Sequence, residues 1–176
     1  MANKERFMKN LDNQNIISVP VASATVIEKG DFVLMWRGSA ITPSMLGDIY
    51  GSATAARREA ANLFGGISQD ASAAGDTLPV SVDIGLDGIY ALDQCTAGAM
   101  SVADLVGFCA TSIAGGLWGL GDQTVEADCS YPIAVVVQEK AATGTRILAK
   151  MLPNRVFNFV HSYPICDTES NMSYAG

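Results

Sequence analysis

The sequence predicts a mainly β protein: a compact β-barrel or β-tulip-like domain of paired hairpins with one short helix, an extended N-terminal arm and a C-terminal tail. Three observations support this fold class. Several short segments alternate apolar and polar residues, turns rich in glycine separate them, and one pattern of turns and strands occurs twice along the chain.

The repeated pattern begins with a turn that opens an apolar strand. The first copy has Gly30-Asp31 at this turn and the second has Ala103-Asp104, which lie 73 positions later. Farther along each copy the spacing becomes 69 positions, which relates Gln69 to Gln138, Ala73 to Ala142 and Gly75 to Gly144. Nothing catalytic recurs, so the repeat favours a structural unit used twice.

The composition limits the class of protein. A chain of 176 residues is expected to form one domain with appended arms, and it is long enough to fold without disulfides or metals. Its 49% hydrophobic content suits a subunit interface, and its net charge of −7 argues against nucleic-acid binding. No apolar run reaches the roughly 18 residues that a membrane helix needs, so no membrane partner is expected.

The N-terminal region, residues 1–15, is predicted to be a polar arm. It lacks the apolar stretch of a signal peptide, which indicates synthesis and retention in the cytoplasm. The strand predicted at 16–21 includes Pro20, which suits a sheet edge or a strand end. The arm is expected either to add a strand to a neighbour's sheet or to be an ordinary frayed terminus.

The predicted core domain covers residues 16–153, and its first half contains a hairpin and the helix. A strand at 25–27 leads through the Gly30 turn into a buried strand at 32–36, and a third strand begins at Ala40. The helix, at about 52–63, is expected to be capped by Ser52 or Thr54 and to end at Gly65-Gly66, with Ala56, Ala60 and Leu63 on one face.

The second half is predicted to be strands and turns. The alternating segment 78–84 is expected to form a hairpin with 89–92 across the turn at 85–88. The apolar segment 132–137, including Val135, is expected to be buried on both faces and to pair with 145–151. Residues 154–176 are predicted to form a C-terminal extension.

No set of residues predicts catalysis, a cofactor or a metal site. The single histidine, His161, lies beyond the predicted core and is interpreted as a surface residue. Asp83 and Asp87 flank a turn and could hold a cation, although isolated turn aspartates are far commoner. The glycine-rich segment 115–122 lacks the Gly-Lys-Ser/Thr ending of a phosphate loop and is interpreted as a hairpin tip.

The four cysteines form no C-x-x-C pair, so neither a zinc motif nor a redox motif is indicated. In a reducing cytosol all four are expected to be thiols, with Cys109 acting as a small buried hydrophobe. The residues predicted to contact partners are large and apolar, and lie in the first strand, at the glycine-rich hairpin tip and in the C-terminal extension: Ile16, Ile17, Val19, Trp118, Phe157 and Phe159.

Several of these features together resemble the head decoration, or cement, proteins of tailed bacteriophages. The resemblance covers about residues 16–153 and rests on turn glycines and strand hydrophobics at these positions: Ile27, Gly30, Asp31, Val33, Phe64 to Ile67, Ala74 to Asp76, Val80, Val82, Gly85, Ile89, Tyr90, Leu92, Ile133 to Val136, Ala142 to Gly144 and Arg146 to Met151. The second copy departs from the pattern with Ala103-Asp104, and the helix lengthens the first copy.

The resemblance implies a virion structural protein, made in the host cytoplasm, that binds the outer surface of the capsid and stabilises it against internal DNA pressure. It implies a homotrimer at three-fold and quasi-three-fold positions, with the major capsid protein as partner, no cofactor and no enzymatic activity. Two alternatives remain: another virion component, such as a minor capsid or tail protein, and a small ligand-binding β-barrel.

Overall fold

The structure is a computed structural model that describes residues 7–9, 16–46, 51–76, 78–84, 88–112 and 118–152; within these ranges the side chains of residues 7–9, 118 and 121–123 are excluded. The strands are β1 (Phe7–Lys9), β2 (Ile16–Val19), β3 (Phe32–Trp36), β4 (Ser39–Ile41), β5 (Phe64–Ser68), β6 (Val80–Asp83), β7 (Ile89–Gln94), β8 (Leu105–Ser112), β9 (Trp118–Ala127), β10 (Ala134–Val136) and β11 (Arg146–Met151). A 3-10 helix, η1 (Pro43–Leu46), and an α-helix, α1 (Ala53–Leu63), join β4 to β5. The predicted mainly β fold with a barrel and one helix is confirmed.

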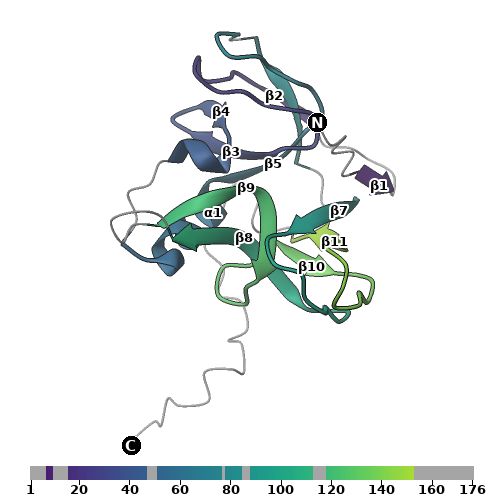
Figure 1. The fold of residues 1–176 in the computed structure, drawn as a ribbon. Helices are drawn as coiled ribbons and strands as arrows, with labels where there is room; N and C mark the ends of the chain where they lie inside the picture. Colours follow the sequence, from purple (N-terminus) through teal and green to yellow (C-terminus); the bar gives the residue numbers. More distant parts are fainter. Residues whose placement is uncertain are drawn as a thin grey trace, which may run out of the picture.

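The strands form two lobes with the same topology (Figure 1). Lobe 1 contains β2 to β6, hydrogen-bonded in the order β2-β6-β5-β3-β4, and lobe 2 contains β7 to β11 in the order β7-β11-β10-β8-β9. A parallel pairing of β7 with β9 closes lobe 2 into a barrel, while a parallel bridge between Val21 and Ala40 links the corresponding ends of lobe 1. Each strand of lobe 1 therefore has a counterpart in lobe 2.

The hydrogen bonds of the opening turn also occur twice. The Asp31 Oδ2 atom accepts a bond from the Glu28 amide (2.8 Å), and the Asp104 Oδ2 atom accepts one from the Ser101 amide (2.7 Å). Between these residues, Gly30 and Ala103 both have positive φ, of 89° and 77°. The Gly30 amide donates to Ser68, as the Ala103 amide donates to Val136. The predicted repeat and its 73-residue spacing are confirmed.

The second predicted spacing, 69 positions, is wrong by one residue. Ile27 forms an antiparallel bridge with Ser72, and its counterpart Met100 forms one with Lys140, so Ser72 corresponds to Lys140 at a spacing of 68. The sequence alignment matched Gln69 with Gln138 because their side chains are identical, but the two residues are not equivalent in backbone hydrogen bonding. The register of strand pairing decides which residues correspond, because a shift of one residue would turn each side chain to the opposite face of the sheet.

Each lobe is filled by its own side chains. The interior of lobe 1 is lined by Val19, Val21, Ile27, Val33, Ala40, Val80 and Val82. Buried counterparts in lobe 2 include Leu92, Met100, Val106, Ile147 and Ala149. Between the lobes, the rings of Phe32, Phe64 and Phe108 meet edge to face, with centroids 5.5 to 6.0 Å apart. This geometry is favourable for aromatic pairs, and it joins the two lobes through one core.

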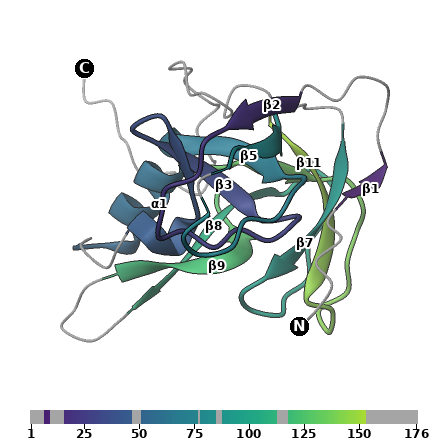
Figure 2. The same ribbon diagram turned by 90° about the horizontal axis from the view of Figure 1, so that it is seen from above.

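Helix α1 connects strands of lobe 1 but covers lobe 2. Ser52 caps it by accepting a hydrogen bond from the Ala55 amide (3.2 Å), as predicted. Ala56, Ala60 and Ala61 are buried, and the helix packs chiefly against β8 and β9 (Figure 2). Small side chains on this face allow the helix to approach the sheet closely. No helix in the described part of the chain combines the length and apolar character needed to cross a membrane.

Some predicted pairings are confirmed and others are wrong. The hairpin of β3 with β4 and the pairing of β10 with β11 are confirmed. The hairpin predicted between 78–84 and 89–92 is wrong: β6 pairs with β2 and β5 in lobe 1, whereas β7 pairs with β11 in lobe 2. The strand at 25–27 pairs at Ser72 and not with β3. Val135 is half-buried, so β10 is not buried on both faces.

One described segment of the predicted arm forms a strand within the same chain. Residues 7–9, strand β1, pair antiparallel with β7 and add a sixth strand to the sheet of lobe 2. Phe7 is opposite Tyr90 and Lys9 is opposite Ile89. Residues 1–6 and 10–15 lie outside the described residues, as do 153–176.

The matched turns predict stability changes of opposite sign. Ala103→Gly should raise the free energy of unfolding by about 0.5–1 kcal/mol, because relieving about 1–2 kcal/mol of left-handed strain exceeds the chain-entropy cost of about 0.5–1 kcal/mol. Gly30→Ala should lower it by a similar amount for the same reasons. Urea denaturation of both variants beside the parent chain measures the changes, and equal signs would contradict the equivalence of the turns.

Candidate functional site

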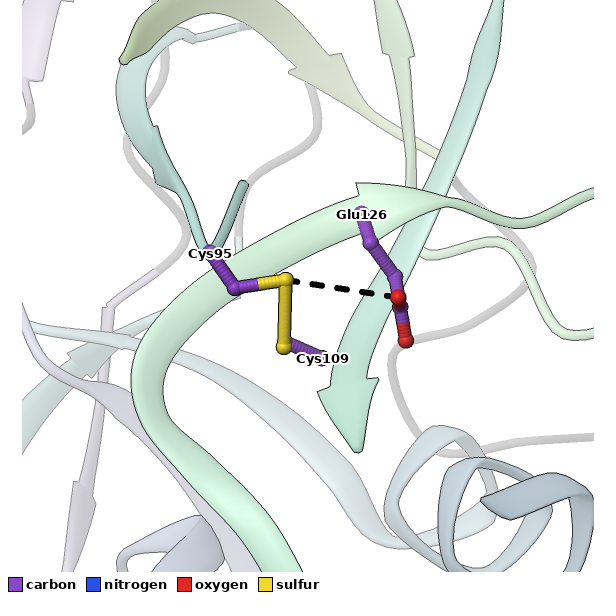
Figure 3. A group of neighbouring side chains, drawn as sticks. All are labelled: Cys95, Cys109 and Glu126. Carbon is purple, nitrogen blue, oxygen red and sulfur yellow. Dashed lines mark hydrogen bonds between the residues drawn. A yellow bond between two sulfur atoms is a disulfide. The ribbon is translucent and has the colours of Figure 1, made fainter. Parts of the chain in front are cut away.

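The cysteine prediction is wrong, because Cys95 and Cys109 form a disulfide (Figure 3). Their Cα atoms are 6.2 Å apart. Cys129 is disulfide-bonded as well, so the expectation of four thiols fails. Cys109 is buried, as predicted, but as half of a covalent link. Sequence spacing could not reveal this pair, because the closure of lobe 2 brings the two residues together.

The disulfide crosses the strand pairing that closes the barrel. Cys95 directly follows β7, and its amide donates to the Val125 carbonyl of β9 (3.1 Å). Cys109 lies on β8 at an irregularity between Phe108 and Ala110, where β8 and β9 lose their regular register. The bond therefore links the two strands that flank β9. In the chain-entropy model, a loop of this length stabilises a fold by about 3 kcal/mol.

Glu126 on β9 lies beside the disulfide and has two differently used oxygens. Its Oε1 atom accepts a hydrogen bond from the Ala110 amide (3.1 Å) and forms an ion pair with Arg57 of α1. Its Oε2 atom faces the Cys95 sulfur at 4.0 Å (Figure 3). Ligand atoms of Cys95, Cys109 and Glu126 all lie within 4.8 Å of one another. Among the described residues, this cluster is the chemically distinctive grouping that sequence reasoning missed.

A buried polar pair joins the two lobes. The Tyr90 hydroxyl of β7 donates to the Asp83 carboxylate of β6 at 2.7 Å, and both residues are buried. Burial raises the pKa of Tyr90, and the hydrogen bond to Asp83 and its charge raise it further. Asp83 therefore acts in the structure as a hydrogen-bond acceptor between the lobes. Asp87, which flanks the same predicted turn, lies outside the described residues.

The predicted interface residues are divided by the structure. Ile16 is 46% exposed, Ile17 is half-buried and Val19 is buried inside lobe 1. Trp118 begins β9, but its side chain is not among those described. Phe157, Phe159 and His161 lie outside the described residues, as does the start of the glycine-rich segment, 115–117.

Exposed large hydrophobic residues are distributed unevenly between the lobes. Among the described residues, five lie in the strands of lobe 1 or in the segments that join them, and one lies in lobe 2: Ile16, Val26, Trp36, Met45 and Leu78, against Val102. Leu78 is 70% exposed and Val26 is 54% exposed.

The residues of lobe 2 that correspond to Val26 and Leu78 are small or polar. Ala99 precedes Met100 as Val26 precedes Ile27, so it holds the place of Val26. Thr145 holds the place of Leu78, because the bond from the Val137 amide to the Leu148 carbonyl repeats the bond from Gln69 to Ser81. The acceptor Ser81 lies three positions after Leu78, and the acceptor Leu148 lies three positions after Thr145. Lobe 2 therefore lacks large apolar side chains at both places.

Val26 and Leu78 belong to two segments that meet at one end of lobe 1. The bridge from Ile27 to Ser72 joins the segments, and the Gly75 amide donates to the Ser23 carbonyl at 2.9 Å. We call this the apolar end of lobe 1. Lobe 1 therefore exposes large apolar side chains at an end where lobe 2 has small or polar ones.

The corresponding end of lobe 2 is more polar. A hollow there is lined by Gln138, Glu139, Lys140, Arg146 and Leu148. The Lys140 ammonium donates to Gln94 and to the Gly98 carbonyl, and Arg146 pairs with Asp93 at 3.0 Å. Both cations are thus used in holding the strand ends together.

Comparison with protein-family models, with curated proteins and with solved structures found no match to this chain.

The Tyr90–Asp83 pair predicts a pH dependence of stability. The pKa of Tyr90 lies above its ordinary value of about 10 in the folded protein, so above that pH the unfolded chain releases a proton that the folded chain keeps. The free energy of unfolding should then fall by up to about 1.4 kcal/mol per pH unit from this group. Tyr90→Phe should remove that contribution.

Tyr90→Phe should also lower stability near neutral pH by about 1–3 kcal/mol, because the buried Asp83 carboxylate loses a donor. Chemical denaturation of the parent and the variant from pH 7 to pH 11 gives both quantities. Parallel curves over the alkaline range would show that the pair has no linked proton.

Proposed function

We propose that this protein is a structural component of a bacteriophage particle that decorates the outer surface of the capsid and reinforces the shell. The observation that carries the proposal is the apolar end of lobe 1, with Val26 and Leu78 exposed where lobe 2 has Ala99 and Thr145. Two lobes of one topology differ there in a way that folding does not require. A surface that attaches to a partner accounts for the difference.

The use of charged side chains supports a structural role. Several carboxylates accept hydrogen bonds from backbone amides. Those of Asp31, Asp76, Asp104 and Asp128 fix turns, and that of Asp70 accepts from the distant Ser81 amide of β6. The chain carries a net charge of −7, which disfavours direct contact with packaged DNA and suits a position outside the shell. The ligand-binding barrel is less well supported, since packed side chains occupy the interior of both lobes.

In this proposal the partner is the major capsid protein, and a homotrimer at three-fold and quasi-three-fold positions is the attached form. Each contact of one apolar end with the shell would be modest. Three linked contacts multiply through effective concentration, so a trimer holds far more tightly than one chain. The protein is made in the host cytoplasm and resides on the virion surface.

Leu78→Glu should weaken attachment to empty shells assembled from the major capsid protein of the same genome. We expect at least a tenfold loss of apparent affinity, because the carboxylate must be dehydrated at an apolar contact and the loss multiplies across the trimer. Leu78 is 70% exposed, so the fold should be unaffected. Co-sedimentation with shells over a range of protein concentrations measures the effect.

The matched control is Thr145→Glu, which places the same charge at the equivalent position of lobe 2 and should change binding less than about twofold. Equal losses in both variants, or none in Leu78→Glu, would refute the apolar end as the attachment surface.

The trimer predicts a defined mass in solution. Multi-angle light scattering of the purified chain should give a mass close to three times 18.4 kDa. A different stable oligomer would instead favour the minor capsid or tail alternative, whose symmetry differs. A monomeric mass would contradict assembly ahead of attachment.

A further inference from the structure

The cluster of Cys95, Cys109 and Glu126 has the chemistry of a metal site as well as of a disulfide. Two sulfur atoms and one carboxylate oxygen converge from the end of β7, from β8 and from β9, all within 4.8 Å (Figure 3). Thiolates together with a carboxylate are donors that suit Zn²⁺. Sulfurs bound to one zinc ion are about 3.8 Å apart, given a Zn–S distance of about 2.3 Å and tetrahedral angles.

Glu126 is already oriented for such a role. Arg57 and the Ala110 amide hold its Oε1 atom, which leaves Oε2 directed at the Cys95 sulfur, 4.0 Å away. Fixing one carboxylate oxygen so that the other faces the metal is how supporting residues orient ligands in metal sites. Cys95 is exposed, so a metal ion can enter from solvent and a water molecule can complete four-coordination.

We propose that reduction of the Cys95–Cys109 disulfide converts this cluster into a Zn²⁺ site with Cys95, Cys109 and Glu126 as ligands. A dithiol reductant supplies two electrons and two protons, the S–S bond breaks into two thiols, and the reductant becomes a disulfide. Binding of Zn²⁺ then displaces the two thiol protons. In either state a link crosses β9 and ties β7 to β8, covalently when oxidised and through the metal when reduced.

The test uses the full chain, reduced with a dithiol and then freed of reductant under anaerobic conditions. Titration with Cd²⁺ reports thiolate bonds through the ligand-to-metal charge-transfer absorbance, and Zn²⁺ should displace the bound Cd²⁺. Because Cys129 is also disulfide-bonded, the titration is done in the Cys129→Ser chain, which lacks that second thiol pair. We expect one Cd²⁺ per chain with this absorbance, and a half-saturating Cd²⁺ concentration at least tenfold higher when Glu126→Gln is added. The untreated, oxidised chain has no thiol at Cys95 or Cys109, so it should lack this band.

Cysteine variants locate the site. The Cys129→Ser chain should retain the one-to-one band, because Cys129 lies outside the cluster, whereas adding Cys95→Ser to it should abolish the band. Far-ultraviolet circular dichroism of each reduced variant establishes that it is folded. Should Cys95→Ser fail to fold, Glu126→Gln decides alone, since it keeps both thiols and the size of the side chain. An absent band, a band lost only in Cys129→Ser, or unchanged affinity in Glu126→Gln would overturn the proposal.

Discussion

The closure of lobe 2 is the constraint on which the arrangement of the second half of the chain depends. Five strands form a ring only if the first and last pair, and here β7 meets β9 through Asp93–Thr124 and Gln94–Val125. Closure removes the open strand edges that the sheet would otherwise present. It also brings Cys95 over Cys109 and places Glu126 beside them, so the candidate site exists only because the ring is closed.

Lobe 1 has the same strand order, but fewer backbone pairs close it. A single parallel bridge at Val21 and Ala40, with amides of both Ala22 and Ala40 bonded across it, replaces the parallel pairing of two strands. The side chains at this bridge are small and apolar, so close packing of Val21 and Ala40 within the core of lobe 1 maintains it. Helix α1 lies in the connection between β4 and β5 of lobe 1, and it covers β8 and β9 of lobe 2.

The sequence allowed the fold class, the helix with its Ser52 cap, the Gly-Asp turns and several strands to be predicted, because these depend on local periodicity and turn chemistry. It failed where pairing is decided at long range. Segments 78–84 and 89–92 look like a hairpin, yet β6 and β7 enter different lobes. The prediction of free thiols was wrong for the same reason, since only the ring of strands brings Cys95 and Cys109 within bonding distance.

The shared topology allows the two lobes of one chain to differ at their ends while they keep the same frame of strands. Equivalent positions in the two lobes have the same strand register and turn geometry, so the fold does not require the side chains there to differ. Gly30 and Ala103 share one backbone conformation although only glycine adopts it without strain, which shows how strongly the turn is determined by its surroundings. Lobe 2 uses its end for the polar contacts of Lys140 and Arg146 and its barrel wall for the disulfide. Lobe 1 keeps the same frame and exposes Val26 and Leu78 instead, so side chains at this end can change without disturbing the closed barrel beside it.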